Sequence, residues 1–325
     1  MKKPDYLIIV DGSDITNIIK KNLIKLTITD KRGIESDKLT IIINDSKGDI
    51  ELPPSGVNIN INIGYSEALS SKGIFIIDSV SHDGPPDKIT INGHGADFRN
   101  SLKDEKFKSW NETTLGEMSQ EISNKNKLTL AISNEASKIK IAHVDQQNES
   151  DMNLLTRLSK ENDLIFTIKE NNLLIKRKSD KKTASGKKLP VFYINRTDCK
   201  SHQFKTSDKQ TFSAVTALYY NVKEAQEESY RIGSESGTNK TIKEKFSSQD
   251  EARNAASSEL KRIQRSDAEI SLKLSFGNEL LIPDSKIILS GFKDEINAKS
   301  WIIDEITHNI NDNGFTTDLK LEVSG

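Results

Sequence analysis

The sequence has little that could cross-link the chain or hold a metal ion. Cys199 is its only cysteine, so no disulfide can form within the chain. Its five histidines are scattered, and no two stand at the spacing used by zinc sites. These absences exclude a disulfide-stapled scaffold and a histidine-based zinc site. They are expected of a chain made in a reducing compartment, or of one that needs no bridges.

The chain also lacks an excess of charge of either sign. Its 47 basic side chains face 48 acidic ones, whereas proteins that bind nucleic acids or anionic membranes normally carry a strong basic excess. The apolar run at residues 6–10 is too short for a signal-peptide core, and no later run approaches the length of a membrane span. We therefore expect a soluble protein made in the cytoplasm, with no nucleic-acid partner and no membrane anchor.

Aromatic residues are scarce, at 6% of the chain, and apolar residues make up 34%. This is lean for a globular monomer but too rich in Ile, Leu and Val for a disordered chain. The length of 325 residues allows two or three domains. We expect a modest core spread over several small domains, with further burial between subunits.

Residues 1–99 have the alternation of a β-structure. In residues 57–63 one valine and three isoleucines alternate with three asparagines, which is the period of a half-buried strand. Turn residues separate the successive runs, which lie at residues 24–28, 39–43, 57–63, 74–80 and 88–92. Short strands with tight turns predict a small barrel or sandwich over residues 1–99.

Residues 100–180 change to a mixed pattern. Thr114 and Glu117 form a capping box that predicts a helix, and Ser150 predicts the start of a second one. Short strands are expected at residues 128–132, 164–168 and 173–177. This segment therefore predicts a small α+β domain.

Residues 181–325 return to strands. A lysine-rich stretch at 178–188 predicts a linker or long loop, and a polar loop is expected at 223–240. A second capping box, Ser248 to Glu251, predicts one inserted helix, and Asn313-Gly314 predicts a closing hairpin. The remaining strands are expected at 212–222, 269–276, 286–291, 301–310 and 315–323. The predicted fold class is α+β and mostly β, with two small β-barrel domains flanking a small α+β domain.

The densest group of reactive side chains lies at residues 143–151. His143 and the carboxylates Asp145, Glu149 and Asp151 could supply metal ligands or an acid–base pair. However, no second histidine stands one helical turn away, and the glycine and closing glutamate of a calcium loop are missing. The alternative is that these groups satisfy the entrance of the helix at Ser150 and the strand end before it. We favour this alternative.

Other motifs are incomplete. The Gly93-His94-Gly95 turn lacks the third glycine of a phosphate loop, and residues 233–237 place glutamate where a nucleophile elbow needs serine. A lone Cys199 is more often an inert small hydrophobe than a nucleophile. We predict that the protein is not an enzyme and has no catalytic residue, cofactor or metal.

Two segments carry a more specific pattern. Residues 107–117 resemble the Ser-Trp…Thr-Thr-Leu-Gly signature of the phage late control D family, and residues 143–158 resemble its His-x-Asp-Gln…Glu-Ser-Asp…Leu-x-Arg-Leu block. A looser form occurs in the VgrG spike proteins of type VI secretion systems. The end of the chain, from Trp301 through His308 to residues 314–317, resembles the family's closing hairpin. One departure is Asn162-Asp163, where a glycine-containing helix end is expected, but asparagine tolerates the left-handed conformation.

The resemblance implies a structural role in a contractile phage tail or tailocin. Such hubs form a homotrimer whose barrel domains build a ring of pseudo-sixfold symmetry in the virion baseplate. The ring joins the tail tube to a trimeric spike, and the tape-measure protein is a further candidate partner. The chain ends soon after the closing hairpin, so we expect the spike to be a separate polypeptide. The motif residues expected to serve structure and assembly are Trp110, Thr114, Leu115, Gly116, His143, Asp145, Gln146, Glu149, Ser150, Asp151 and Arg157.

Two other functions are considered beside the hub. A tail-associated murein hydrolase or peptidase would use His143, Asp145, Glu149 and Asp151. A glycan-binding adhesin would stack sugars on Trp110 or Trp301. A live phage, a defective prophage and a tailocin would each carry such a hub.

Overall fold

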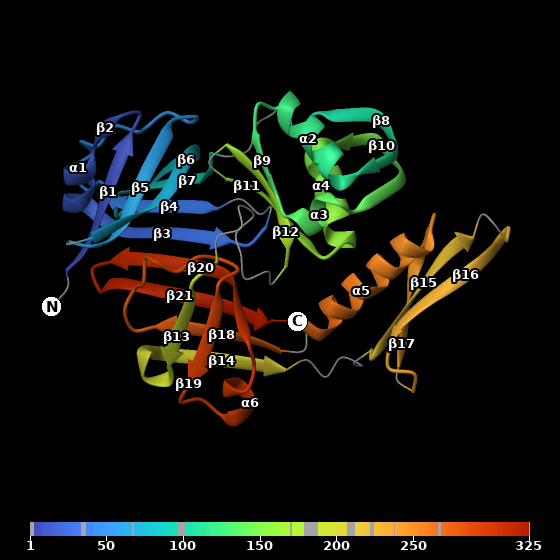
Figure 1. Cartoon of the computed structure of the whole chain (residues 1–325). Helices are drawn as coiled ribbons and strands as arrows, with labels where there is room; N and C mark the ends of the chain where they lie inside the picture. The colour runs from blue at the N-terminus through green and yellow to red at the C-terminus, as the bar shows by residue number, and fades with distance from the viewer. Residues whose placement is uncertain are drawn as a thin grey trace. The chain divides into compact units, whose positions relative to one another are not determined.

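The fold is α+β and mostly β, as predicted (Figure 1). The computed structural model describes residues 3–33, 37–66, 68–96, 102–169, 171–178, 188–206, 212–221, 224–236, 238–265 and 268–324. Contacts divide the chain into two compact units. Unit 1 comprises Met1–Asp97, Val191–Phe204 and Ile270–Leu321, and unit 2 comprises Phe98–Pro190, Lys205–Glu269 and Glu322–Gly325. The predicted boundaries of three consecutive domains stay a prediction.

Unit 1 is built from strands of both chain ends. The N-terminal elements are β1 (Pro4–Val10), β2 (Ser13–Asp14), α1 (Thr16–Asn22), β3 (Leu23–Lys31), β4 (Lys38–Asn44), β5 (Asn58–Tyr65), β6 (Ala68–Asp83) and β7 (Lys88–Gly95). The later elements are β13 (Val191–Asn195), η2 (Arg196–Asp198), β14 (Cys199–Thr206), β18 (Ala268–Leu274), β19 (Lys286–Ser290), α6 (Asp294–Asn297), β20 (Trp301–Asn311) and β21 (Gly314–Val323).

One sheet runs through this unit in the order β14-β18-β21-β20-β3-β4-β7-β6-β5-β1-β2, and β19 joins β13 to β20. The junction is the antiparallel pair β20–β3, in which Ile310 lies opposite Leu26. The alternation predicted for residues 57–63 is confirmed, because Ile59, Ile61 and Ile63 are buried. The hairpin predicted at Asn313-Gly314 is confirmed as well, and Gly314 takes the positive φ of 105° that glycine tolerates.

In its described residues, unit 2 combines three small sheets with helices. Its elements are β8 (Glu105–Thr114), α2 (Leu115–Lys125), β9 (Thr129–Ile132), α3 (Asn134–Ser137), β10 (Lys140–Ser150), α4 (Asp151–Glu161), β11 (Leu164–Lys169), β12 (Asn172–Arg177), β15 (Ala214–Asn221), β16 (Gln226–Gly233), β17 (Asn239–Phe246) and α5 (Gln249–Arg265). The sheets are β10–β8, β11–β12–β9 and β16–β15–β17. Helix α5 covers the last of these, and Ala252 and Ala256 pack against Val215, Ala217 and Tyr219.

Several local predictions differ from the structure. The polar loop expected at 223–240 contains strand β16 and the first residues of β17. Strand β16 is hard to recognise because its alternate residues are only half-buried, and the others are exposed and polar. The short helix α1 was also missed within a segment expected to be all β. The predicted linker falls largely on residues 179–187, which lie outside the described residues.

The second capping box forms only in part. The Ser248 hydroxyl accepts a hydrogen bond from the Glu251 amide at 3.3 Å, as expected. The Glu251 carboxylate, however, accepts from the amide of Ser247, one residue before the cap, and from the amide of Ala142, and not from the amide of Ser248. One bond to the residue before the cap and one long-range bond therefore replace the reciprocal half of the motif.

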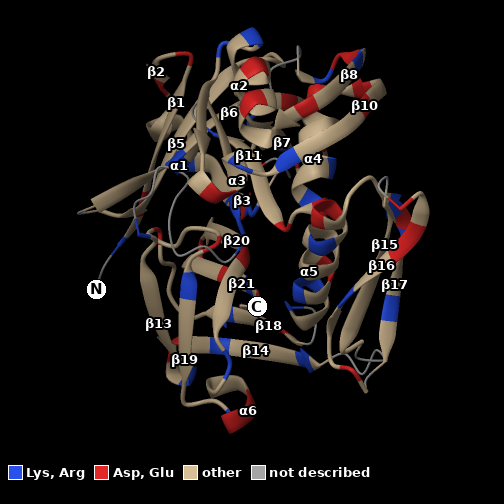
Figure 2. Ribbon diagram, turned by 45° about the vertical axis from the view of Figure 1, so that its right-hand side comes forward, with Lys and Arg blue, Asp and Glu red and all other residues tan. Residues whose placement is uncertain are grey.

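In the part of the chain that the structure describes, charged residues of both signs occur along the ribbon (Figure 2). None of the helices in the described ranges combines the length and the apolar character needed to cross a membrane.

Candidate functional site

The two motif segments form one structure, the antiparallel ribbon β8–β10 and the helices that follow each strand. In this ribbon Trp110 lies opposite Val144, Ser109 opposite Asp145 and Asn111 opposite His143. Strand β8 leads into α2 and strand β10 leads into α4. The helix entrances were predicted, whereas the strand pairing was not.

The entrance of α2 is a complete capping box. The Thr114 hydroxyl accepts a hydrogen bond from the Glu117 amide at 3.2 Å, and the Glu117 carboxylate accepts from the Thr114 amide at 2.9 Å. The bond from the Thr114 amide, and then the bonds that the Thr113 and Thr114 hydroxyls donate to the same carboxylate, lower the pKa of Glu117 below its ordinary value. Leu115 is completely buried, and its amide donates to the Ile139 carbonyl at 2.8 Å.

Gly116 brings α2 against the backbone of α3. A Cβ atom at this position would stand 2.8 Å from the carbonyl oxygen and 3.2 Å from the Cα atom of Ser137. The motif therefore has glycine here because of a close approach between two helices.

The variant Gly116→Ala is expected to lower the free energy of unfolding by about 1–3 kcal/mol, the usual cost of overpacking. The loss should appear although alanine favours the helix by about 1 kcal/mol. Urea denaturation would measure it. Gln120→Ala, at an exposed position of the same helix, should stay within about 0.5 kcal/mol of the wild type. An equally stable Gly116→Ala protein would contradict the packing argument.

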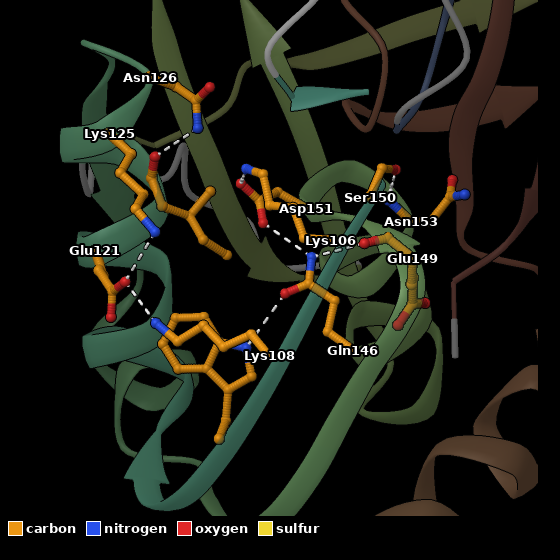
Figure 3. Close-up of polar contacts among 12 residues, drawn as sticks. Lys106, Lys108, Glu121, Lys125, Asn126, Gln146, Glu149, Ser150, Asp151 and Asn153 are labelled. Atoms are coloured by element: carbon orange, nitrogen blue, oxygen red, sulfur yellow. Dashed lines mark hydrogen bonds and ion pairs between the residues drawn. The ribbon is translucent and has the colours of Figure 1, made fainter. Parts of the chain in front are cut away.

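A buried polar network lies under the ribbon (Figure 3). Gln146 is only 1% exposed, and its Nε2 donates to the Glu149 carbonyl and to Asp151 Oδ1, both at 2.9 Å. Its Oε1 accepts from the Trp110 indole at 3.5 Å. Asp151, also buried, forms an ion pair with Lys106. These side chains satisfy one another, as buried polar groups must.

The ring of Trp110 lies beneath Lys108, whose Nζ is 3.4 Å from the ring centroid. The same ammonium group bonds to Glu121 of α2 at 2.5 Å (Figure 3). Trp110 is 7% exposed, and Trp301 is fully buried with its indole bonded to the Ile296 carbonyl at 2.9 Å. Neither indole offers an open face on which a sugar could stack.

The end of β10 is fixed by Arg157 of α4. Its guanidinium donates to the two Glu149 oxygens at 3.1 and 2.7 Å, and to the Asp145 carbonyl at 3.4 Å. The Glu149 bonds raise the pKa of Arg157 above its ordinary value. Ser150 caps the helix, because its hydroxyl accepts from the Asn153 amide at 3.2 Å. The predicted start of α4 is confirmed.

The outer face of the ribbon carries an exposed chain of hydrogen bonds. Asp145 accepts from the Ser109 hydroxyl at 2.5 Å and contacts His143 Nε2 at 3.3 Å, while His143 Nδ1 contacts Asn111 at 2.5 Å. These contacts, the Ser109 bond first, lower the pKa of Asp145. The Ser109 hydroxyl donates to the Asp145 carboxylate and not to the His143 imidazole. These contacts therefore do not form the serine–histidine pair that activates a serine nucleophile.

The structure thus distributes the four residues considered for catalysis over three different surroundings. His143 and Asp145 lie on the outer face, Glu149 is paired with Arg157, and Asp151 is buried against Lys106. Among the described residues, no three His, Cys, Asp or Glu side chains are placed to hold a metal ion. The arrangement orders two strands and two helices, and it does not gather groups around a reacting atom.

A cleft of about 260 Å³ in unit 2 lies beside Arg157, between β10 and α4 on one side and β17 and α5 on the other. Burial raises the pKa of Glu161 in its wall, and the nearby Glu244 adds to the effect, while Arg157 opposes it. The polar groups of this cleft are engaged in part with one another, since Glu161 contacts Arg157 at 3.7 Å.

An ion pair between Asp163 and Arg265 was missed by the sequence analysis. Arg265 Nη1 bonds to Asp163 Oδ2 at 3.0 Å, Arg265 Nη2 bonds to Oδ1, and both side chains are about 5% exposed. Asp163, and not Asn162, takes the left-handed conformation after α4, with φ 55°. In the sequence, the one indication of an unusual end of α4 is that Asn162-Asp163 stands where a glycine is expected.

Comparison with known protein families gives one match over most of the chain. The model of the phage tail baseplate hub family matches residues 87–314. The probable baseplate hub protein of Escherichia phage 186 is 33% identical, over 98% of this chain and 93% of its own length. The corresponding protein of Escherichia phage P2 is 34% identical over the same shares.

Solved structures agree in fold. The 43 kDa tail protein of prophage MuSo2 from Shewanella oneidensis superposes with a TM-score of 0.70 at 16% identity, over 98% of both chains. An Escherichia coli component of the type VI secretion system gives a TM-score of 0.58 at 12% identity, over 94% of this chain and 74% of its own.

Proposed function

Because the chain belongs to the phage tail baseplate hub family, we propose that it forms a homotrimeric ring between the tail tube and a trimeric spike of a contractile tail. The observation that carries this proposal is the identity of 33–34% with two probable baseplate hub proteins over nearly the whole chain. The protein would be made in the host cytoplasm and become part of the virion baseplate or of a tailocin. The tape-measure protein is a further candidate partner.

The motif residues would serve assembly by holding a rigid ribbon. Gln146, Asp151 and Lys106 satisfy one another in its interior, and Arg157 holds the end of β10. A buried, fully bonded polar network fixes one arrangement of the strands. We propose that the ribbon is a scaffold and that the protein catalyses no reaction.

Light scattering would test the trimer. We expect a mass three times that of one chain, either for the protein alone or after addition of the spike protein encoded in a neighbouring reading frame. A protein that stays monomeric with both the spike and the tube protein would overturn the proposal. Clearing of cell-wall sacculi that is lost in Asp145→Ala would instead establish the hydrolase.

A further inference from the structure

Unit 1 is built from two halves with the same strand order. Along the sheet the N-terminal half reads β3-β4-β7-β6-β5-β1, and the C-terminal half reads β14-β18-β21-β20-β19-β13. Strands at the same place in the two halves are counterparts, and the counterparts also follow one another in the same order along the chain. The last pair departs from this rule, because β1 pairs with β5 antiparallel whereas β13 pairs with β19 parallel. The other five strands of each half correspond in place and in order.

The two halves are joined along one edge of β20. The first residues of β20 pair with β19, with Ile302 opposite Lys286. Because β21 takes the other edge of β20, residues 305–311 pair with β3 on the same edge as β19. Glu305 and Lys31 lie opposite each other in this second stretch and form an ion pair at 3.3 Å. Strand β20 thus uses the part of its edge that β19 leaves uncovered to hold the first long strand of the other half.

Strand β6, the counterpart of β20, has the same kind of uncovered stretch. Strand β5 pairs with residues 68–76 of β6, and the last bond on that edge runs from the Gly56 amide to the Ile77 carbonyl at 2.9 Å. Strand β7 pairs with the opposite edge as far as Asp83. In the described part of the chain, no strand pairs with the first edge beyond Ile77. Residues 78–83 are therefore the free stretch of β6.

Strand β14, the counterpart of β3, is a free end of the sheet. It pairs with β18 on one side, and among the described residues no strand pairs with its other side. Residues 200–203 are all exposed, so that both faces of the strand are open there. Unpaired strand edges readily pair with another chain, and lysines on an edge oppose pairing with an identical edge. Lys200 and Lys205 therefore leave β14 open to a strand of opposite charge.

The charges of the two free stretches are complementary. Strand β14 carries Lys200 and Lys205 and no acidic residue. The free stretch of β6 contains Asp78 and Asp83 and no lysine or arginine, and both aspartates are exposed. Asp78 contacts His94 within the chain, which leaves the negative charge of Asp83 and the exposed side of Asp78 toward solvent. An acidic edge and a basic edge favour each other over a copy of themselves.

We propose that β14 of one copy of this chain pairs antiparallel with the free stretch of β6, residues 78–83, in the next copy. This pair repeats between copies the junction that β3 and β20 make within one copy. A second copy is the occupant because it supplies the counterpart of that junction and an edge of opposite charge. Each copy gives one edge and receives the other, and such head-to-tail contacts close into a ring when the rotation divides the circle. The inference rests on the proposed homotrimer, for which it names the contact.

Cross-linking between introduced cysteines tests the contact directly. In a Cys199→Ala background, Ser81→Cys and Ser201→Cys place thiols at exposed positions of the two stretches. A short bismaleimide added to a mixture of the two single variants, with and without the spike protein, should give a covalent dimer on a denaturing gel. The protein that carries both cysteines should give a covalent trimer. In the matched control Ser290→Cys, at an exposed position of β19, replaces Ser201→Cys and should give neither product.

Charge reversal tests the same contact by light scattering. Lys200→Glu with Lys205→Glu should raise the concentration for half-assembly at least about 10-fold, because like charges then meet. Asp78→Lys with Asp83→Lys should have the same effect from the other side of the contact. The protein that carries all four substitutions should recover assembly, since the charges are again opposite. Circular dichroism would check that each variant is folded.

Lys138→Glu with Lys293→Glu is the matched control for charge, because both lysines are exposed and lie on neither strand, and it should assemble as the wild type does. A trimer whose cysteines on β6 and β14 do not cross-link would overturn the contact and leave the proposed trimer standing. Folded charge variants that assemble normally, or a loss of assembly that the four substitutions together do not reverse, would overturn the contact as well. A wild-type protein that stays monomeric with both the spike and the tube protein would overturn both proposals.

Discussion

Replacing Arg265 with leucine is expected to lower the free energy of unfolding by about 3–5 kcal/mol, because it leaves the Asp163 carboxylate buried without its partner. The two side chains are about 5% exposed and meet through two hydrogen bonds. They join the end of α4 to the end of α5 within unit 2. Urea denaturation followed by circular dichroism would measure the loss.

Two further variants separate the burial effect from the charge itself. The double variant Asp163→Leu, Arg265→Leu should recover part of the stability, because an apolar pair needs no desolvation of charge, while leucine at the left-handed position 163 costs about 1–2 kcal/mol. Arg262→Leu breaks an ion pair with Glu259 in which the arginine side chain is 63% exposed, and it should cost at most about 1 kcal/mol. A loss below about 1 kcal/mol for Arg265→Leu would show that the buried pair contributes little.

The sequence predicted the features whose signal is local. Thr114 and Ser150 cap their helices as expected, and Asn313-Gly314 turns the last hairpin. Each of these depends on residues a few positions apart. The join of β20 to β3 depends on residues at opposite ends of the chain, and no local pattern records it. The alternation of apolar and polar residues in β20 and β3 predicts that each strand lies in a sheet, but it does not identify the strand beside it.

The sequence indicates which residues make up the candidate site, but not which of their side chains lie together. Residues 143–151 alternate between the two faces of β10, so that Asp145 points to solvent while Gln146 is buried. A bulge after Gln147 then shifts the register and places Glu149 beside Arg157. Because strand pairing distributes neighbouring carboxylates to different surroundings, a cluster in the sequence is not a cluster in space.

A buried histidine in unit 1 makes the stability of the protein depend on pH. His308 of β20 is 1% exposed, and its Nδ1 contacts the Thr317 hydroxyl at 2.9 Å. Its Nε2 has no hydrogen-bond partner among the described residues. Burial, and to a lesser extent the charge of Lys72, lower the pKa of His308 well below its ordinary value of 6.5. The folded protein therefore holds the neutral ring, and the unfolded chain binds the proton more readily.

The contribution of His308 to stability is fully present above pH 6.5 and is lost as the pH falls below that value. The slope should reach about 1.4 kcal/mol per pH unit, the effect of one proton. Thermal unfolding between pH 8 and pH 4.5 would show a steeper decline for the wild type than for His308→Gln, while His143→Gln, at an exposed position, should follow the wild type. Parallel curves for the wild type and His308→Gln would mean that the buried ring takes up its proton without cost.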